Sequence, residues 1–475
     1  MYPHDLEGRG SLKKYEYLHS CLRRDIRSGA LQAGVRLASK RELAERLGVS
    51  VSTVERAYDL LASEGYVLAR PGSGFYVSEV AARELPEAEE SEEGPDEGAH
   101  KVFDANANRN GIRLFPANTW VRCMRRILSA QDSEMYETVP LNGLYELRRA
   151  IAEYLFESRG IVVDPACVVV GAGTEFLYSR LIHLLAGRPR LVTGDIYPKK
   201  LVQIARNSGA TWEFVTADLH GMRTEELGAT SAQAVLVSPA NLFPTGAVLP
   251  MERREELLRW VEAEPRRLVI EDDYDSELRY SQRSLPTLFG MCQSERVIYL
   301  NTFSKTLVPS IRISYMVLPH RLMEIYRDQA GFYSCTASSL EQATLAEFIS
   351  EGHFRRHVNH LRRYYRRQRD VFVEKVDSSR LSLVGHLLPS EVGTHLLLSV
   401  DTRMSDRQIV EAAAERSLSL DMLSGHCACQ DVLHAGYVVL NTASVEEARV
   451  GELVSILEDV FADDIARAEA SRGRR

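Results

Sequence analysis

Residues 296–307 have the sequence RVIYLNTFSKTL, in which a β-branched apolar run ends in hydroxyl side chains and a lysine. The run RVIYL predicts a buried strand. At its end, Lys305 is placed to form a Schiff base while the small hydroxyl residues Thr302 and Ser304 hold a phosphate. A lone Ser-Lys pair is a weak signal, because most lysines are solvated surface charges. The rest of the chain therefore has to supply the partners of Lys305.

Five other apolar runs resemble this strand, and amphipathic stretches such as LLRWVEAEP lie between such runs. They are CVVVGAG (167–173), RLVTGD (190–195), AVLVSP (234–239), RLVIEDD (267–273) and SYMVLP (314–319). This alternation predicts βαβ units, and hence an α/β fold with a mostly parallel sheet covered by helices on both faces. A chain of 475 residues has room for two or three domains.

The strand RLVIEDDYD, residues 267–275, brings acidic side chains to its C-terminal end. One of these carboxylates is placed to pair with a protonated pyridine nitrogen, and Tyr274 to donate to an oxygen on the same ring. That electrostatic arrangement makes pyridoxal phosphate an electron sink. The residues therefore indicate this cofactor, with Lys305 as its attachment point.

Other strand ends carry further candidates for the same site. In CVVVGAGTE, Gly173 and Thr174 place backbone amides and a hydroxyl at a helix N-terminus, where a phosphate binds well, although a plain strand-to-helix turn remains the alternative. Tyr197 follows another strand and is placed to stack on the ring. Asn241 precedes a Phe-Pro-Thr-Gly turn, and Arg312, seven residues after Lys305, is placed to complete the anion site.

The N-terminal part has a different, helical pattern over residues 39–62, SKRELAERLGVSVSTVERAYDLLA. Ser39 and Glu42 form a capping box that starts one helix, and Gly48 ends it. The second helix is then available for a major groove. GYVLARPGSGFYV follows, with a tight turn between two short apolar runs that predicts a wing, and Arg70 on it can meet phosphate. The alternative is a small helical dimerisation module.

An acidic segment joins these two parts. Residues 79–101 carry two Lys or Arg against nine Asp or Glu, whereas the whole chain has a net charge of -8. Acidic repulsion, proline, glycine and a shortage of large apolar residues predict a flexible linker; the alternative is a charged surface helix. The overall charge therefore hides an N-terminal part that carries 12 basic against 9 acidic residues over 1–78.

Residues 11–78 resemble the GntR type of winged helix-turn-helix, through SKRELAERLGVS, STVERAYDLL and EGYVLARPGSG. The resemblance implies binding to double-stranded operator DNA through Lys40, Arg41, Ser50, Ser52, Thr53, Arg70 and Gly72. Many relatives have Arg where this chain has Val51, and some have another at Glu55. An apolar side chain can contact a thymine methyl, whereas an arginine binds guanine with two hydrogen bonds; the resemblance therefore implies docking in the groove but does not specify the operator sequence.

Residues 102–465 resemble the fold type I aminotransferases of pyridoxal phosphate, with a smaller C-terminal α+β subdomain. The strings VVGAGTE, SPANLFPTG, IEDDYDSELRY and NTFSKTLVPSIRISYMVLP make the resemblance closest to the MocR family, which joins that fold to a GntR unit. The resemblance implies Lys305 as the Schiff-base lysine and Asp272 as the pyridine partner, ahead of Asp273. It further implies these cofactor contacts: Gly173, Thr174, Tyr197, Asn241, Tyr274, Thr302, Ser304, Arg312 and, from a second subunit, Tyr136.

One departure concerns the arginine with which true aminotransferases, and some members of the family, clamp a substrate carboxylate. The corresponding stretch here is YVVLNTAS, with no arginine at Val438 or Val439, and a second such position is Lys199. Losing the planar fork weakens amino-acid binding. The departure favours a transcriptional regulator that senses pyridoxal 5′-phosphate, alone as in a PdxR-like branch or with an amino compound. The alternative is an active aminotransferase with an appended DNA-binding module; the regulator would retain at most residual transamination.

The remaining expectations concern location, assembly and metal. The sequence has no apolar run long enough to span a bilayer and no signal peptide at its start, so a cytoplasmic protein is expected. The family implies a head-to-tail homodimer. His426, Cys427 and Cys429 lack a second pair at a zinc spacing, so no metal site is expected. The basic stretch 353–370 is expected to be a surface helix, with a phosphate-binding face as the alternative.

Overall fold

The computed structural model describes residues 12–79, 103–105, 112–130, 136–185, 187–280, 285–428 and 435–472. The chain divides into two compact units, Met1–Ala99 and His100–Arg475. The expected linker lies outside the described residues apart from Glu79, as does Cys429.

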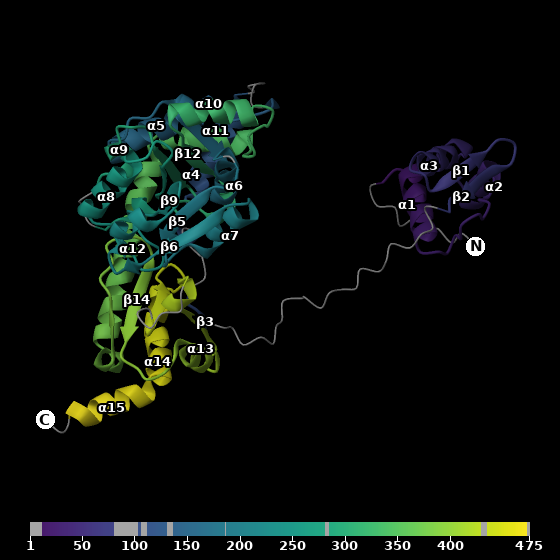
Figure 1. The fold of residues 1–475 in the computed structure, drawn as a ribbon. Helices are drawn as coiled ribbons and strands as arrows, with labels where there is room; N and C mark the ends of the chain where they lie inside the picture. The colour runs from purple at the N-terminus through teal and green to yellow at the C-terminus, as the bar shows by residue number, and fades with distance from the viewer. Residues whose placement is uncertain are drawn as a thin grey trace. The chain divides into compact units, whose positions relative to one another are not determined.

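The small unit contains three helices and a two-stranded wing, as the sequence predicts (Figure 1). Its elements are α1 (Lys14–Arg27), α2 (Lys40–Leu47), α3 (Val51–Ser63), β1 (Val67–Arg70) and β2 (Gly74–Val77). Ser39 and Glu42 form the predicted capping box of α2, and Gly48 ends that helix in the left-handed region at φ 61°. Tyr58 of α3 is fully buried and donates to the carbonyl of Ala38, which holds α3 against the start of α2.

The wing is an antiparallel hairpin in which Arg70 faces Gly74. Gly72 adopts φ +75° in its turn, a conformation that glycine reaches without the steric cost of a side chain. Arg70 lies over the ring of Tyr76 at 4.4 Å. The tip of the wing is therefore an exposed turn with a guanidinium beside it.

The large unit is built on a seven-stranded sheet in the order β4-β12-β11-β10-β9-β5-β6, in which only β12 is antiparallel to its neighbours. Its strands are β4 (Val168–Gly171), β5 (Arg190–Gly194), β6 (Thr211–Val215), β9 (Ala234–Val237), β10 (Leu268–Asp272), β11 (Val297–Thr302) and β12 (Ser314–Val317). All six expected strands are present. The unpredicted strand, β6, lies at the sheet edge and is only partly buried, which explains its weak apolar pattern.

Helices cover this sheet (Figure 1). They are α4 (Ala117–Ser129), α5 (Tyr145–Arg159), α6 (Thr174–Leu184), α7 (Lys199–Asn207), α8 (Met251–Glu262), α9 (Leu288–Met291), α10 (His320–Ala330) and α11 (Ser339–Ser350). Most of their apolar faces join the strands in one large core, whereas α8 and Leu288 of α9 pack with other residues of the sheet in a second cluster. The α/β expectation is confirmed.

A second, antiparallel sheet forms the C-terminal part, in the order β13-β14-β17-β16. Its main strands are β14 (His395–Val400) and β17 (Tyr437–Asn441), with β13 (Gly385–Leu387) and β16 (Asp421–Met422) beside them. Beside it lie α12 (His353–Asp377), α13 (Asp406–Ala414), α14 (Val450–Val460) and α15 (Ala462–Arg472), and a short parallel pair, β3 (Phe103–Asp104) and β15 (Leu418–Ser419). These elements enclose a separate core.

The basic stretch 353–370 lies within helix α12, whose apolar side packs into the core. Arg362 and Arg366 donate to the backbone carbonyls of Glu277 and Tyr280, and Arg369 to that of Ser390. The side chains therefore tie the two sheets together, as expected for a surface helix. No helix among the described residues is both long and apolar enough to cross a membrane.

Candidate functional site

Lys305 lies beyond the end of β11, beside the C-terminal end of β10. The two strands run parallel and pair Asp272 with Leu300, so the groups that follow both strands meet at one sheet edge. The Lys305 ammonium lies 5.8 Å from the centre of the Tyr274 ring. Burial lowers the pKa of Lys305, and the carboxylates of Asp275 and Asp272 partly oppose that shift. A lysine with a lowered pKa is more often the neutral amine, which is the nucleophilic form.

The two neighbouring aspartates at the end of β10 have opposite environments. Asp273 accepts hydrogen bonds from Arg159, Tyr299 and Ser276, and these groups hold its pKa below the ordinary value against the effect of burial. Asp272 accepts no hydrogen bond from a cation among the described residues, and only the charge of Lys305 opposes the rise of its pKa. Burial, followed by the charge of Asp273, raises its pKa to about 7, and its Oδ1 finds no hydrogen-bond partner among the described residues. Asp273 Oδ1 also lacks a hydrogen-bond partner in the described structure, but the other oxygen of Asp273 already binds a guanidinium, so Asp272 is the better placed of the pair to bind a cationic group of a ligand.

A third carboxylate, that of Asp275, is hydrogen-bonded to the side chain of Asn241. The amide of Asn241 donates to both oxygens of Asp275, at 2.8 and 2.7 Å. Burial raises the pKa of Asp275 to about 7 in spite of this. Gly393 packs against the pair so closely that a Cβ there would lie 2.4 Å from the Asn241 amide nitrogen. The turn after β9 is therefore locked onto the segment after β10.

Hydroxyl groups on three segments form a connected chain. Ser314 of β12 donates to Thr302 at 2.7 Å and lies 3.2 Å from the hydroxyl of Thr174. The backbone amide of Ser304 donates to Thr302, while the Ser304 hydroxyl is buried without a partner in the described structure. Thr174, Thr302 and Ser304 are predicted from the sequence, whereas Ser314 is not, although a serine at the start of the apolar strand SYMV was a usable signal.

Gly173, Thr174 and Arg312 form one corner at the start of α6. Gly173 has φ +92°, and a Cβ on it would lie 2.6 Å from Arg312 Nη2. The Arg312 guanidinium lies 3.6 Å from Glu175 and is about half exposed. A helix N-terminus, hydroxyls and a guanidinium together suit an anion.

Two predicted aromatic contacts have different surroundings. The ring of Tyr197 lies against Phe214, with centroids 4.9 Å apart, and its backbone amide donates to the carbonyl of His426. Tyr136 is 72% exposed. It is thus a surface residue of this unit, as a residue that serves a neighbouring subunit would be.

A histidine that the sequence did not predict, His395, interacts electrostatically with Lys305. The positive charge of Lys305 helps burial to lower the pKa of His395 to about 3, and the edge of its ring packs on Phe243 at 4.8 Å. Its Nδ1 has no hydrogen-bond partner among the described residues. The alternation of β14 gave no signal for it, because strand periodicity does not show which end meets a site.

Other residues occupy the positions where the resemblance to aminotransferases would place a carboxylate-binding arginine. Val438 and Val439 are buried, and Val439 faces Leu397 and Asp421 in the small sheet. Lys199 begins α7 and is exposed. Cys427 is buried, and its thiol donates to the carbonyl of Leu423, as in an ordinary loop.

The surroundings of Lys305 fit pyridoxal phosphate. Among the buried polar atoms that lack a hydrogen-bond partner in the described structure, three belong to predicted cofactor contacts: Asp272 Oδ1, the Tyr274 hydroxyl and the Ser304 hydroxyl. They match a ring nitrogen, a ring hydroxyl and a phosphate. Because a buried unsatisfied polar group destabilises a protein, three of them at one sheet edge are expected where a polar ligand belongs.

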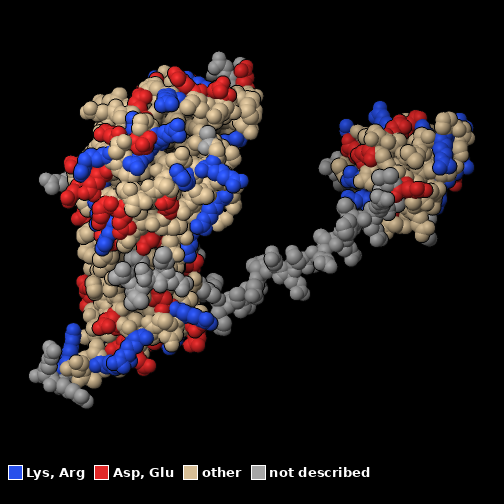
Figure 2. All heavy atoms as spheres, viewed as in Figure 1, with Lys and Arg blue, Asp and Glu red and all other residues tan. Residues whose placement is uncertain are grey.

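In the small unit, the predicted DNA contacts lie on α2, α3 and the wing. Arg41, Ser50 and Ser52 are exposed, and the hydroxyl of Ser50 caps α3 by accepting from the Thr53 amide. Lys40 pairs with Glu55 at 2.7 Å, so a phosphate would have to compete for its ammonium. Acidic side chains accompany the basic ones on the face shown in Figure 2.

Comparison with known proteins agrees with both units. The family "Bacterial regulatory proteins, gntR family" matches residues 14–77, and "Aminotransferase class I and II" matches residues 102–427. The chain is 32% identical to the probable rhizopine catabolism regulatory protein MocR of Rhizobium meliloti, over 93% of each protein. It is 30% identical to the pyridoxine biosynthesis transcriptional regulator PdxR of Corynebacterium glutamicum, over 85% of this chain and 86% of that one. The solved kynurenine aminotransferase of Pyrococcus horikoshii shares the fold, with a TM-score of 0.69 and 20% identity over 77% of this chain and 92% of that chain.

Proposed function

The chain belongs to the MocR-type transcriptional regulators, gntR-family proteins with an aminotransferase-like domain, and from this premise we propose that it senses pyridoxal 5′-phosphate at Lys305. The gntR unit binds operator DNA. Ligand binding in the large unit changes the affinity of the chain for that DNA. This requires the ligand to bind two states of the protein unequally.

The observation that carries the proposal is that three predicted cofactor contacts, Asp272, Tyr274 and Ser304, each have a buried polar atom without a hydrogen-bond partner in the described structure. When bound, the cofactor supplies a carbonyl for the lysine and an electron-withdrawing ring. Asp272 would hold the pyridine nitrogen, Tyr274 the ring oxygen and Ser304 a phosphate oxygen. The raised pKa of Asp272 fits this role: burial and the charge of Asp273 outweigh the opposing charge of Lys305, so a cation bound at this carboxylate would stabilise its charged form.

The neighbouring groups would orient the ligand. Thr174, Thr302 and Arg312 would contact the phosphate, with Gly173 leaving room for the guanidinium. Tyr197 would cover the ring, and the Asn241–Asp275 pair would border it. Tyr136 would reach the site of a second subunit in a head-to-tail homodimer.

The absence of the carboxylate clamp favours sensing over turnover. An arginine binds a carboxylate with two parallel hydrogen bonds, whereas the position expected for it holds the buried, apolar Val439. Lys199 offers only a point charge. An α-amino acid is therefore a poor ligand here, and any transamination would be slow.

On the DNA side, we assign phosphate and base contacts to Arg41, Ser50 and Ser52, with Thr53, Lys40, Arg70 and Gly72 beside them. A dimer would place two such units on paired half-sites. This partner places the protein in the cytoplasm, where bacterial DNA lies.

Binding of the full chain to the DNA upstream of its own gene tests the proposal. The cofactor is removed with hydroxylamine, and DNA affinity is measured by fluorescence anisotropy with and without added pyridoxal 5′-phosphate. Coupling of about 1–3 kcal/mol predicts an affinity change of about 5- to 150-fold. Pyridoxine, which lacks both the aldehyde and the phosphate, is the matched control ligand and should have no effect.

Two results would contradict the proposal. Equal DNA affinity with and without the cofactor would remove the sensing role. Transamination at about 1 s⁻¹ or faster, within the ordinary range of enzymes, would favour the aminotransferase alternative.

A further inference from the structure

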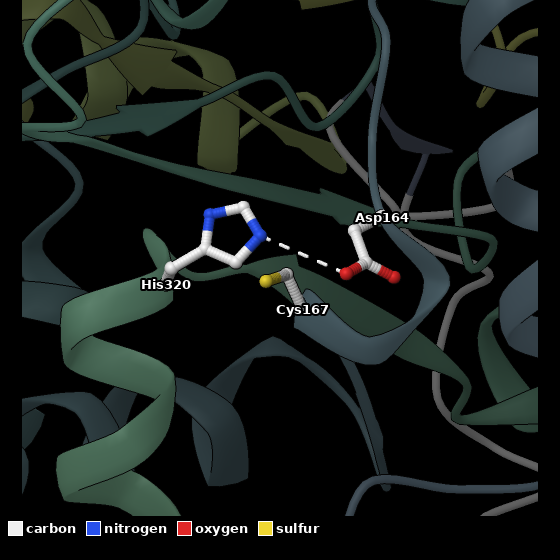
Figure 3. A group of neighbouring side chains, drawn as sticks. All are labelled: Asp164, Cys167 and His320. Atoms are coloured by element: carbon white, nitrogen blue, oxygen red, sulfur yellow. Dashed lines mark ion pairs between the residues drawn. The ribbon is translucent and has the colours of Figure 1, made fainter.

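A group of three metal-ligating side chains lies apart from the Lys305 site: Asp164, Cys167 and His320 (Figure 3). One potential ligand atom of each lies within 4.8 Å of the others. Asp164 and Cys167 precede β4, and His320 follows β12 in the chain. Since β4 and β12 pair antiparallel, with Val168 opposite Val317 and Gly171 opposite Ser314, the group lies at the strand ends remote from the Lys305 site.

Each side chain is held in place by its own segment. Asp164 caps a short 3₁₀ helix, η4 (Pro165–Cys167): its Oδ1 accepts from the amide of Ala166, which leaves Oδ2 facing His320 Nε2 at 3.6 Å. Cys167 is only 5% exposed, and its thiol, which faces this group, makes no hydrogen bond to another described residue. His320 begins α10 and is well exposed.

Glu295 contacts the other side of the same imidazole. Its Oε1 lies 2.8 Å from His320 Nδ1. A carboxylate on Nδ1 holds the proton there and directs the Nε2 lone pair toward Asp164 and Cys167. Zinc-bound histidines in proteins are almost always oriented in this way by a carboxylate, carbonyl or water on the second nitrogen.

We propose that Asp164, Cys167 and His320 bind a zinc ion, with Glu295 as the positioning residue for the histidine. Zinc takes sulfur, imidazole and carboxylate ligands at about 2.0–2.3 Å in a tetrahedron, which puts neighbouring ligand atoms roughly 3.3–3.8 Å apart. The 3.6 Å between Asp164 and His320 already lies in this range, and the 4.8 Å limit leaves small movements for the thiolate. A thiolate together with an imidazole favours zinc over magnesium or calcium, which take oxygen ligands.

The fourth ligand is a water. The group borders a surface cavity of about 340 Å³, which Asp164, Cys167, Glu295 and His320 all line. This is ample space for a solvent ligand. The site would connect the edge strand β4 to β12, strands whose opposite ends carry Gly171 and the hydroxyl chain of Ser314. The ion would therefore brace the strands that lead to the Lys305 site.

Zinc binding by the full, untagged chain tests this proposal. The protein is stripped with a chelator and titrated with zinc against a chromophoric competitor. One tight site per chain is expected, and cobalt in its place should give a thiolate-to-cobalt charge-transfer band. His320→Ala should weaken zinc binding at least 100-fold, and Glu295→Gln about 10- to 100-fold, because it disturbs only the orientation of the histidine.

Two controls separate this site from adventitious binding and from misfolding. His220→Ala removes an exposed histidine from another loop and should leave zinc affinity unchanged. Cys167→Ser should abolish the charge-transfer band while the bound pyridoxal phosphate keeps its visible spectrum, which shows a folded large unit. Equal zinc affinity of the wild type and His320→Ala, or a charge-transfer band that persists in Cys167→Ser, would overturn the proposal; a zinc-independent surface ion pair would then describe the group.

Discussion

Replacing Asp272 by asparagine should stabilise the cofactor-free protein and at the same time weaken its binding of pyridoxal phosphate. The side chain keeps its size and loses its charge. Asp272 is buried, its Oδ1 has no partner among the described residues, and its pKa is raised from 3.8 to about 7. When the pKa of a carboxyl group is higher in the folded than in the unfolded protein, the group gives its full support to folding only at a pH below its pKa in the unfolded chain. That support is lost as the pH rises through the folded pKa.

The size of the change in the free energy of unfolding follows from the pKa shift of Asp272. About three pKa units at 1.36 kcal/mol each set an upper value of roughly 4 kcal/mol for the penalty of ionised Asp272 above pH 7. The same relation gives about 1–2 kcal/mol at pH 5 and close to zero at pH 3. Asp272→Asn should therefore raise the free energy of unfolding by about 2–4 kcal/mol at pH 8 and progressively less toward pH 4. Loss of a charge-assisted hydrogen bond of about 1.5–3 kcal/mol should weaken cofactor binding at least about tenfold.

Urea unfolding, followed by tryptophan fluorescence, measures the free energy of unfolding of each variant. All three tryptophans, Trp120, Trp212 and Trp260, lie in the large unit, so the signal reports that unit alone. The matched control is Asp273→Asn, which should lower the free energy of unfolding where Asp272→Asn raises it. It removes the partner of the largely buried Arg159 and should destabilise by about 3–5 kcal/mol at pH 8, with the difference shrinking as acid protonates Asp273 in the wild type.

The reasoning would be refuted if Asp272→Asn lowered stability at pH 8, or if its effect were the same at pH 4 and pH 8. Unchanged cofactor affinity in this variant would separately remove Asp272 from the cofactor site. Because the stability and binding measurements have opposite expected signs, general misfolding of the variant cannot imitate the predicted result.

Three further variants test the cofactor site around Lys305 and the DNA-binding surface of the small unit. Lys305→Ala should abolish covalent attachment of pyridoxal phosphate, measured as the mass retained after borohydride reduction; retention of that mass would move the attachment to another lysine. Gly173→Ala should weaken cofactor binding at least about tenfold and destabilise the large unit by about 1–3 kcal/mol, since φ is +92° and the new Cβ would lie 2.6 Å from Arg312; calorimetry with and without cofactor checks both. Arg41→Ala should weaken operator binding and lower the salt-dependence slope by about one, measured by anisotropy at several salt concentrations; an unchanged slope would exclude a phosphate contact.

Several features of this protein could be predicted from local sequence because they depend on residues close along the chain. The cap of α2 joins Ser39 to Glu42, three positions later, and the wing turn needs only a glycine at positive φ. The strands of the large sheet are short apolar runs that remain recognisable whatever packs on them. The motif around Lys305 is likewise contiguous, so the candidate attachment point and its hydroxyl neighbours could be named directly.

The tertiary structure decided what depends on distant partners. Asp272 and Asp273 are adjacent and chemically identical, but Arg159, 114 positions away, Tyr299 and Ser276 all donate to an oxygen of Asp273. In the same way, His395 comes to Lys305, and His320 to Asp164 and Cys167, through the packing of strands far apart in sequence. Burial and electrostatic interactions act through space, so the chain order alone specifies which groups exist but not which of them remain available to a ligand.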